Sequence, residues 1–107
     1  MPADLARGLA VVQQQINELD ALARQTLEDL NTVAGTERVV KWKAKTVALL
    51  TEAVGQQEGQ QFAAVHAGPS FTNDMVEEFT DLIDSYRTPL TTLAKQLAKV
   101  PRLSPGS

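Results

Sequence analysis

Apolar or small side chains in the first third of the chain recur at alternating steps of four and three residues. The positions that share this spacing are Leu5, Leu9, Val12, Ile16, Leu19, Ala23, Thr26, Leu30 and Val33. One face of an α-helix repeats at this interval, so the pattern predicts a long helix over residues 3–33. We expect Gly35 to end this helix, because glycine readily takes the left-handed conformation common after helix ends.

The next segment begins with Thr36, whose hydroxyl suits it to cap the amino terminus of a helix. We expect a second helix over residues 37–54, ending at Gly55. A polar turn follows, and a short helix is expected over residues 57–67. The Gly-Pro-Ser sequence at residues 68–70 interrupts this short helix.

The last third of the chain carries the most regular apolar spacing. Its members are Val76, Phe79, Ile83, Tyr86, Leu90, Leu93, Leu97 and Val100. They predict a helix over residues 73–100 that opens at Thr72, with Phe71 and Val76 packed across its first turn. Pro89 removes a backbone hydrogen-bond donor, so we expect a kink there. The spacing continues in phase beyond Pro89, which indicates one bent helix rather than two.

The lengths of these helices suggest how they assemble. At 1.5 Å per residue the first and last helices are roughly 45 and 40 Å long. The second and the short helix, laid end to end as a broken middle layer, reach about the same length. We therefore predict an all-α, antiparallel bundle of three to four helices, with two long helices and two shorter ones. The bundle is expected to form one domain over residues 1–101, followed by a tail or linker start at 102–107.

Composition narrows the class of protein. The chain has 107 residues, a formal charge of −3 and no cysteine, which excludes disulfides and thiolate chemistry. The amino terminus lacks the pattern of a signal peptide, and no segment approaches the ~20 apolar residues of a membrane span. We therefore expect a soluble cytoplasmic protein that does not bind membranes. The negative charge also argues against a general affinity for nucleic acid.

The segment 38–46 places four cations around the only tryptophan. At 100° per residue, Arg38, Lys41 and Lys45 fall on one side of the second helix, beside the apolar side. The ordinary interpretation is the solvated face of an amphipathic helix. A nucleic-acid patch is the alternative, but only one aromatic residue lies nearby and no second basic cluster extends the footprint.

Lys43, in contrast, falls within the apolar side of the same helix. A buried ammonium group is costly unless it is paired, so its stem either reaches past the edge of the core or meets a carboxylate. We expect an ion pair with Asp81 or Asp84. Trp42 flanks the apolar side, and we expect it to pack at the core edge; the alternative is an exposed anchor for a partner.

No arrangement of catalytic or metal-binding residues is evident. His66 is the only histidine, and a helix break separates it from Ser70 and Asp74, so no catalytic triad is expected. A single histidine with scattered carboxylates is not a convincing zinc site, and no glycine-rich phosphate loop occurs. The carboxylates early in the last helix are interpreted as a solvated acidic face: Asp74, Glu77, Glu78, Asp81 and Asp84. We expect no enzyme activity, no cofactor and no metal.

A tryptophan, a leucine pair, a glycine turn and a following phenylalanine occur in order at Trp42, Leu49, Leu50, Gly55 and Phe62. On these residues, the segment 37–97 resembles small helical accessory domains of bacterial defence proteins, which precede an effector such as a Toll/interleukin-receptor-like domain. It implies an accessory domain for self-association or sensing, with any catalysis elsewhere.

These observations predict a non-catalytic helical module that binds a protein partner or its own copies. The candidate partner-binding residues are Arg38, Lys41, Trp42, Lys43 and Lys45. The alternative function is a small nucleic-acid-associated regulator that uses the basic face of the second helix.

Overall fold

The computed structural model describes residues 2–66 and 74–103 of the chain. These residues form four α-helices and no strand: α1 (Pro2–Asp29), α2 (Thr32–Ala53), α3 (Gln56–Ala63) and α4 (Met75–Leu103). The predicted all-α bundle is confirmed.

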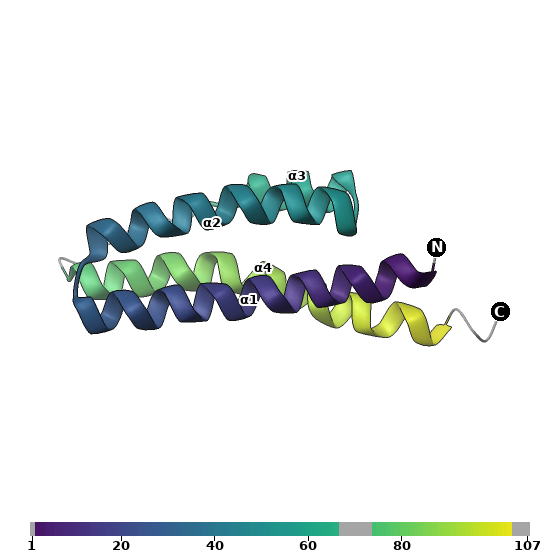
Figure 1. Cartoon of the computed structure of the whole chain (residues 1–107), viewed down its shortest axis with the longest axis horizontal. Coiled ribbons are helices and arrows are strands. Elements are labelled where there is room, and N and C mark those ends of the chain that lie inside the picture. Colours follow the sequence, from purple (N-terminus) through teal and green to yellow (C-terminus); the bar gives the residue numbers. More distant parts are fainter. Residues whose placement is uncertain (1, 67–73, 104–107) are drawn as a thin grey trace.

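The three long helices lie side by side along the length of the molecule (Figure 1). α1 runs antiparallel to both α2 and α4 and packs against each of them. α3 turns back and packs against the carboxyl-terminal half of α2, so the predicted end-to-end middle layer is wrong. Gly59 explains this, because a β-carbon at that position would overlap the Thr51 side chain of α2. The two helices therefore cross at a distance that only glycine permits.

The boundary between α1 and α2 differs from the prediction. α1 ends at Asp29 and α2 begins at Thr32, several residues before the expected stop at Gly35 and cap at Thr36. Leu30 takes the left-handed conformation (φ 55°). Asn31 caps α2 instead, since its side-chain oxygen accepts a hydrogen bond from the Ala34 N–H at 3.1 Å. Asparagine is a favourable cap because its side chain accepts a hydrogen bond from a backbone N–H in the first turn, so α2 begins before Gly35.

Gly35 is therefore a buried residue inside α2, where it permits close packing. A β-carbon there would lie 2.5 Å from Thr26 Oγ1 of α1 and 3.0 Å from Phe79 Cε1 of α4. Thr26 is itself fully buried, and its hydroxyl donates to the Leu22 carbonyl at 2.8 Å. The absence of a side chain at position 35 lets three helices meet at one level.

The later helices agree with the sequence pattern more closely. α3 ends at Ala63, four residues earlier than expected. α4 is one continuous helix through Pro89, as predicted, and its yellow carboxyl-terminal part slants relative to its green amino-terminal part (Figure 1). The Asp74 carboxylate caps α4, because its Oδ1 accepts hydrogen bonds from the Val76 N–H at 2.9 Å and from the Glu77 N–H at 3.3 Å. The predicted break at 68–70, the predicted helix start at Thr72 and Phe71, which was predicted to pack on Val76, lie outside the described residues.

The core is centred on three aromatic rings. Trp42 is 3% exposed and packs edge-on against Phe62 of α3, with ring centroids 5.8 Å apart. Tyr86 of α4 closes the cluster at 6.2 Å from Trp42 and 5.9 Å from Phe62. The indole N–H donates to the Gln15 carbonyl of α1 at 3.1 Å, so Trp42 contacts all three other helices. The core-packing interpretation of this residue is confirmed.

Gly35→Ala is expected to lower the free energy of unfolding by about 1–3 kcal/mol, because overpacking outweighs the better helix propensity of alanine. Urea unfolding measures this loss. Adding Thr26→Ala, which removes the atoms that would clash, should recover part of it. A Gly35→Ala variant as stable as the parent would contradict the close packing.

Leu30→Gly is expected to raise the free energy of unfolding by about 0.5–1 kcal/mol, because glycine takes the left-handed conformation without steric cost. Leu30 is 69% exposed, so little packing is lost with its side chain. Leu30→Ala is the matched control, since it truncates the side chain but keeps the strain. Equal stabilisation by both substitutions would show that backbone strain is not the cause.

Candidate partner-binding groove

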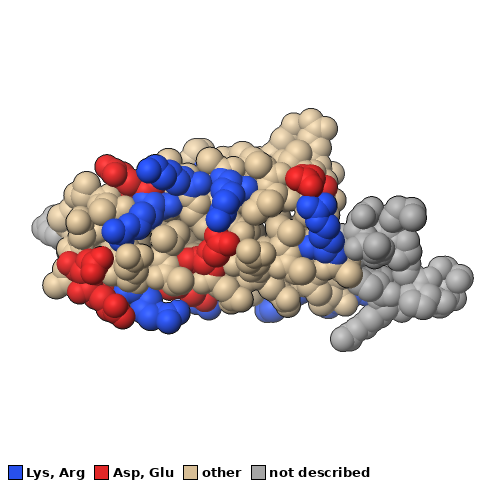
Figure 2. Space-filling view, in the orientation of Figure 1, with Lys and Arg blue, Asp and Glu red and all other residues tan. Residues whose placement is uncertain are grey.

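Three cations of α2 lie along the side of that helix that borders α1. They contribute to a groove of about 490 Å³ between the two helices. Its lining residues are Glu18, Ala21, Leu22, Gln25, Arg38, Lys41, Trp42 and Lys45. Figure 2 shows lysine and arginine side chains gathered on this face over α2, with carboxylates between them and α1. The structure thus brings four of the five predicted partner-binding residues to one surface.

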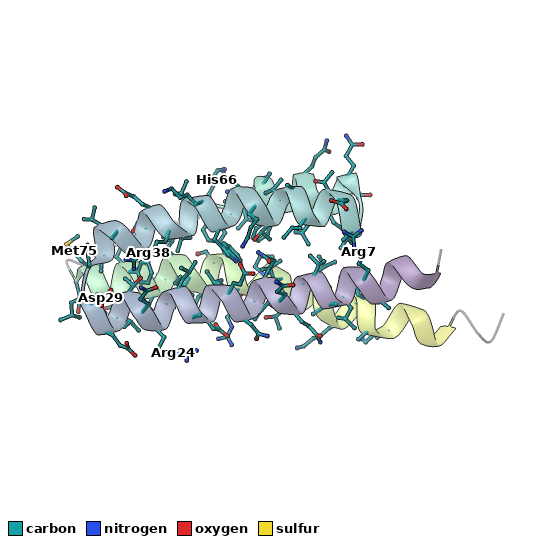
Figure 3. The ribbon with its side chains drawn as sticks, in the orientation of Figure 1. Arg7, Arg24, Asp29, Arg38, His66 and Met75 are labelled. Atoms are coloured by element: carbon teal, nitrogen blue, oxygen red, sulfur yellow. The ribbon has the colours of Figure 1, made fainter. Side chains whose placement is uncertain are left out.

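Two of these cations are held by carboxylates from α1. Lys45 Nζ lies 2.5 Å from Glu18 Oε1, which is a hydrogen-bonded ion pair. Arg38 Nη1 lies 3.9 Å from Asp29 Oδ2, near the end of the bundle where α1 joins α2 (Figure 3). That distance permits attraction but is too long for a hydrogen bond. Lys41 forms no ion pair with any residue that the structure describes.

The Arg38 guanidinium is therefore incompletely satisfied. Its Nη1 atom is buried, yet it has no hydrogen-bond acceptor among the described residues. A buried donor without an acceptor costs about 1–3 kcal/mol, and more when the group is charged. An acidic group that entered the groove would meet the exposed Lys41 and the accessible part of the Arg38 side chain, which is 34% exposed, and would supply counter-charge there.

The floor between the charged side chains is apolar. Ala21 and Leu22 of α1 contribute to it, together with the part of Trp42 that borders the groove. Because Trp42 is 3% exposed, it is a wall of the groove rather than a protruding anchor. A partner would bury methyl and methylene groups here while its carboxylates meet the cations at the rim.

Lys43 lies apart from this groove, and its predicted ion pair with Asp81 or Asp84 is wrong. Its Nζ donates to the Val65 carbonyl at 2.8 Å and lies 5.0 Å from the centre of the Tyr86 ring. Val65 follows the end of α3, so its carbonyl is free to accept. The two aspartates are exposed on α4 and form no ion pair with described residues. The lysine stem thus reaches past the core to a backbone acceptor.

No protein-family model, curated protein or solved structure matches this chain. The functional proposal therefore rests on the geometry of the α1–α2 groove.

The charge around the groove does not favour a nucleic-acid partner. Glu18 and Asp29 stand among the cations and partly neutralise them. Phosphate backbones bind best to basic surfaces that extend over many contacts, and carboxylates at the same surface repel them. The mixed charge suits a protein surface better.

The remaining chemistry-bearing residues are dispersed. His66, labelled in Figure 3, is exposed beyond the end of α3 and is not among the residues that line the groove, and Ser70 is outside the described residues. Within residues 2–66 and 74–103, no group of three or more histidine, aspartate or glutamate side chains is arranged to hold a metal ion. In the same part of the chain, no helix combines the length and apolarity needed to cross a membrane.

Sequence reasoning found the cationic wall of the groove but missed the wall supplied by α1. Glu18, Gln25 and Asp29 are spaced by seven and four residues, which places them on one stripe of a helix. The spacing of these polar residues was therefore the sequence signal for the α1 wall of the groove. It indicates a groove wall only once α1 and α2 are known to pack as an antiparallel hairpin.

Lys43→Met is expected to lower the free energy of unfolding by about 1–2 kcal/mol, because the Val65 carbonyl loses its charged donor and Tyr86 its cation. The loss should be equal at low and high salt, since no carboxylate is involved. Lys41→Met, at an exposed position, is the control and should change stability by less than about 0.5 kcal/mol. If high salt abolished the effect of Lys43→Met, a carboxylate partner would be indicated.

Proposed function

We propose that this protein is a non-catalytic helical association module and that the α1–α2 groove binds its protein partner. The observation that carries the proposal is the groove itself, in which Lys41 is exposed and forms no ion pair with any residue that the structure describes. Arg38, whose side chain is 34% exposed, lines the same groove, and its Nη1 lies 3.9 Å from Asp29 Oδ2. A bound carboxylate would supply counter-charge to both cations.

The groove also defines the chemistry of the partner. Arg38, Lys41 and Lys45 follow one another at roughly one-turn spacing, so they suit carboxylates that are similarly spaced along a helix. The apolar floor suits short side chains between those carboxylates. Charge complementarity of this kind sets partner choice and orientation and accelerates association. The partner segment is therefore an acidic helix with small side chains on its binding face.

The resemblance to accessory domains of bacterial defence proteins supports the same class of function. In that setting the module would recruit or assemble a separate effector, and the groove would supply the contact. Such a role needs a rigid surface more than a deep cavity, which agrees with an open groove between two long helices.

Photocrosslinking tests this proposal. A benzophenone amino acid at Lys41 is expected to form an adduct with a protein in cells that produce the chain, and mass spectrometry should locate the crosslink in an acidic helical segment. The same amino acid at Gln60, exposed on α3, is the matched control and should give no adduct.

Adding Ala21→Glu should abolish the Lys41 adduct, because the new carboxylate fills the groove floor and repels an acidic partner. Equal labelling at positions 41 and 60, an adduct that persists with Ala21→Glu, or a basic crosslinked segment would overturn the proposal.

A further inference from the structure

α4 presents an acidic face on the side that points away from the bundle. Its buried side chains Phe79, Ile83 and Tyr86 face the core. The opposite side carries Glu77, Asp81 and Asp84, all of them exposed. Asp81 and Asp84 form no ion pair with any residue that the structure describes. We name the outward face formed by Glu77, Asp81 and Asp84 the acidic ridge.

From the acidic ridge and the α1–α2 groove, we infer that the acidic partner is a second copy of this chain, whose ridge enters the groove of the first. This inference rests on the proposed function and names the partner. It joins a groove whose Lys41 forms no ion pair with any described residue to a ridge whose Asp81 and Asp84 form none with the same residues.

The spacing of the charges fits this pairing. On α2 the cations lie three and then four residues apart, at Arg38, Lys41 and Lys45. On α4, read in the opposite direction, the carboxylates also lie three and then four residues apart, at Asp84, Asp81 and Glu77. At 1.5 Å per residue both rows are about 10 Å long. An antiparallel approach therefore sets each cation opposite one carboxylate without any adjustment of either helix.

A parallel approach would need Asp74 in place of Asp84 to keep the same spacing. The Asp74 carboxylate already accepts hydrogen bonds from Val76 N and Glu77 N as the cap of α4. The carboxylates of Asp81 and Asp84, in contrast, form no ion pair with any residue in the described part of the chain. The antiparallel register is therefore favoured, with Lys41 opposite Asp81 at its centre.

The central pairs form at low cost. Neither Lys41 nor Asp81 forms an ion pair with another described residue, so no ion pair within residues 2–66 and 74–103 has to break. Asp84 would supply an acceptor for Arg38, whose contact with Asp29 is long at 3.9 Å. Thr88, one turn beyond Asp84, is a small exposed residue on the same side of α4.

The groove and the ridge are different surfaces of the molecule, so the contact is heterologous. Each copy can offer its groove to one neighbour and its ridge to another, and such contacts close into rings or continue as chains. Association of this kind should depend strongly on ionic strength, since exposed charges are screened within about 3 Å at 1 M salt but act over about 30 Å at 0.01 M.

Charge reversal on the full-length chain, followed by sedimentation velocity at low salt, tests the inference. Lys41→Glu and Asp81→Lys alone should each weaken self-association by at least about tenfold, because like charges then face each other. An equimolar mixture of the two variants should restore it, since every groove then meets a complementary ridge. The Lys41→Glu/Asp81→Lys double variant should restore it as well.

Arg24→Glu is the matched control, because it reverses an exposed cation on α1 outside the groove lining and should leave association unchanged. Circular dichroism and urea unfolding of each variant check that the fold is retained. Single reversals that associate like the parent, a mixture or double variant that fails to recover, or a parent chain that stays monomeric at low salt would each overturn the inference.

The two proposals fail separately. A monomeric parent whose Lys41 position still crosslinks to a different acidic protein would end the self-association inference and leave the proposed function standing. Absence of any groove-dependent adduct, including one of doubled mass, would end both.

Discussion

The contact on which the structure depends is the one between Trp42 of α2 and the Gln15 carbonyl of α1. A buried indole N–H must find an acceptor, and here the acceptor lies on a helix that the sequence places 27 residues away. The Gln15 side chain adds a second link, since its Nε2 donates to Thr46 Oγ1 at 2.8 Å, and Thr46 in turn donates to the Trp42 carbonyl at 2.8 Å. Polar groups buried among apolar ones tolerate only one relative position of two helices, so this network sets the axial register of α1 against α2.

The surface follows from that register. Once Gln15 lies opposite Trp42 and Thr46, Glu18 is level with Lys45, and Asp29 approaches Arg38 only at 3.9 Å. A shift of one turn would exchange these partners. The uneven pairing of the three cations on α2 is therefore a consequence of a core contact, and so is the open stretch of groove that Lys41 lines.

Small residues decide how closely the helices approach. Gly35 brings α2 onto Thr26 and Phe79, and Gly59 brings α3 onto Thr51. At both positions a β-carbon would overlap a neighbouring side chain, so the close crossings and the glycines require each other. The result is a narrow, elongated bundle, 53 Å long and 24 by 20 Å across. Cations of α2 and carboxylates of α1 meet along the α1–α2 groove, and exposed carboxylates lie on the outward side of α4.

The sequence alone determined the features that arise from local periodicity: the all-α class, the core face of α4, its continuity through Pro89 and the cationic side of α2. These follow from spacing along one helix, which is visible in the chain. The tertiary structure decided the rest. From the sequence Gly35 is expected to end a helix, but in the structure Thr26 and Phe79 crowd it inside α2. Lys43 is expected to pair with a carboxylate, but it donates to the Val65 carbonyl beyond the end of α3. The α1 wall of the groove likewise depends on how two helices are aligned. A glycine, a lysine or a carboxylate can adopt several conformations or contacts of similar free energy. The neighbouring residues in the folded structure determine which of these is observed.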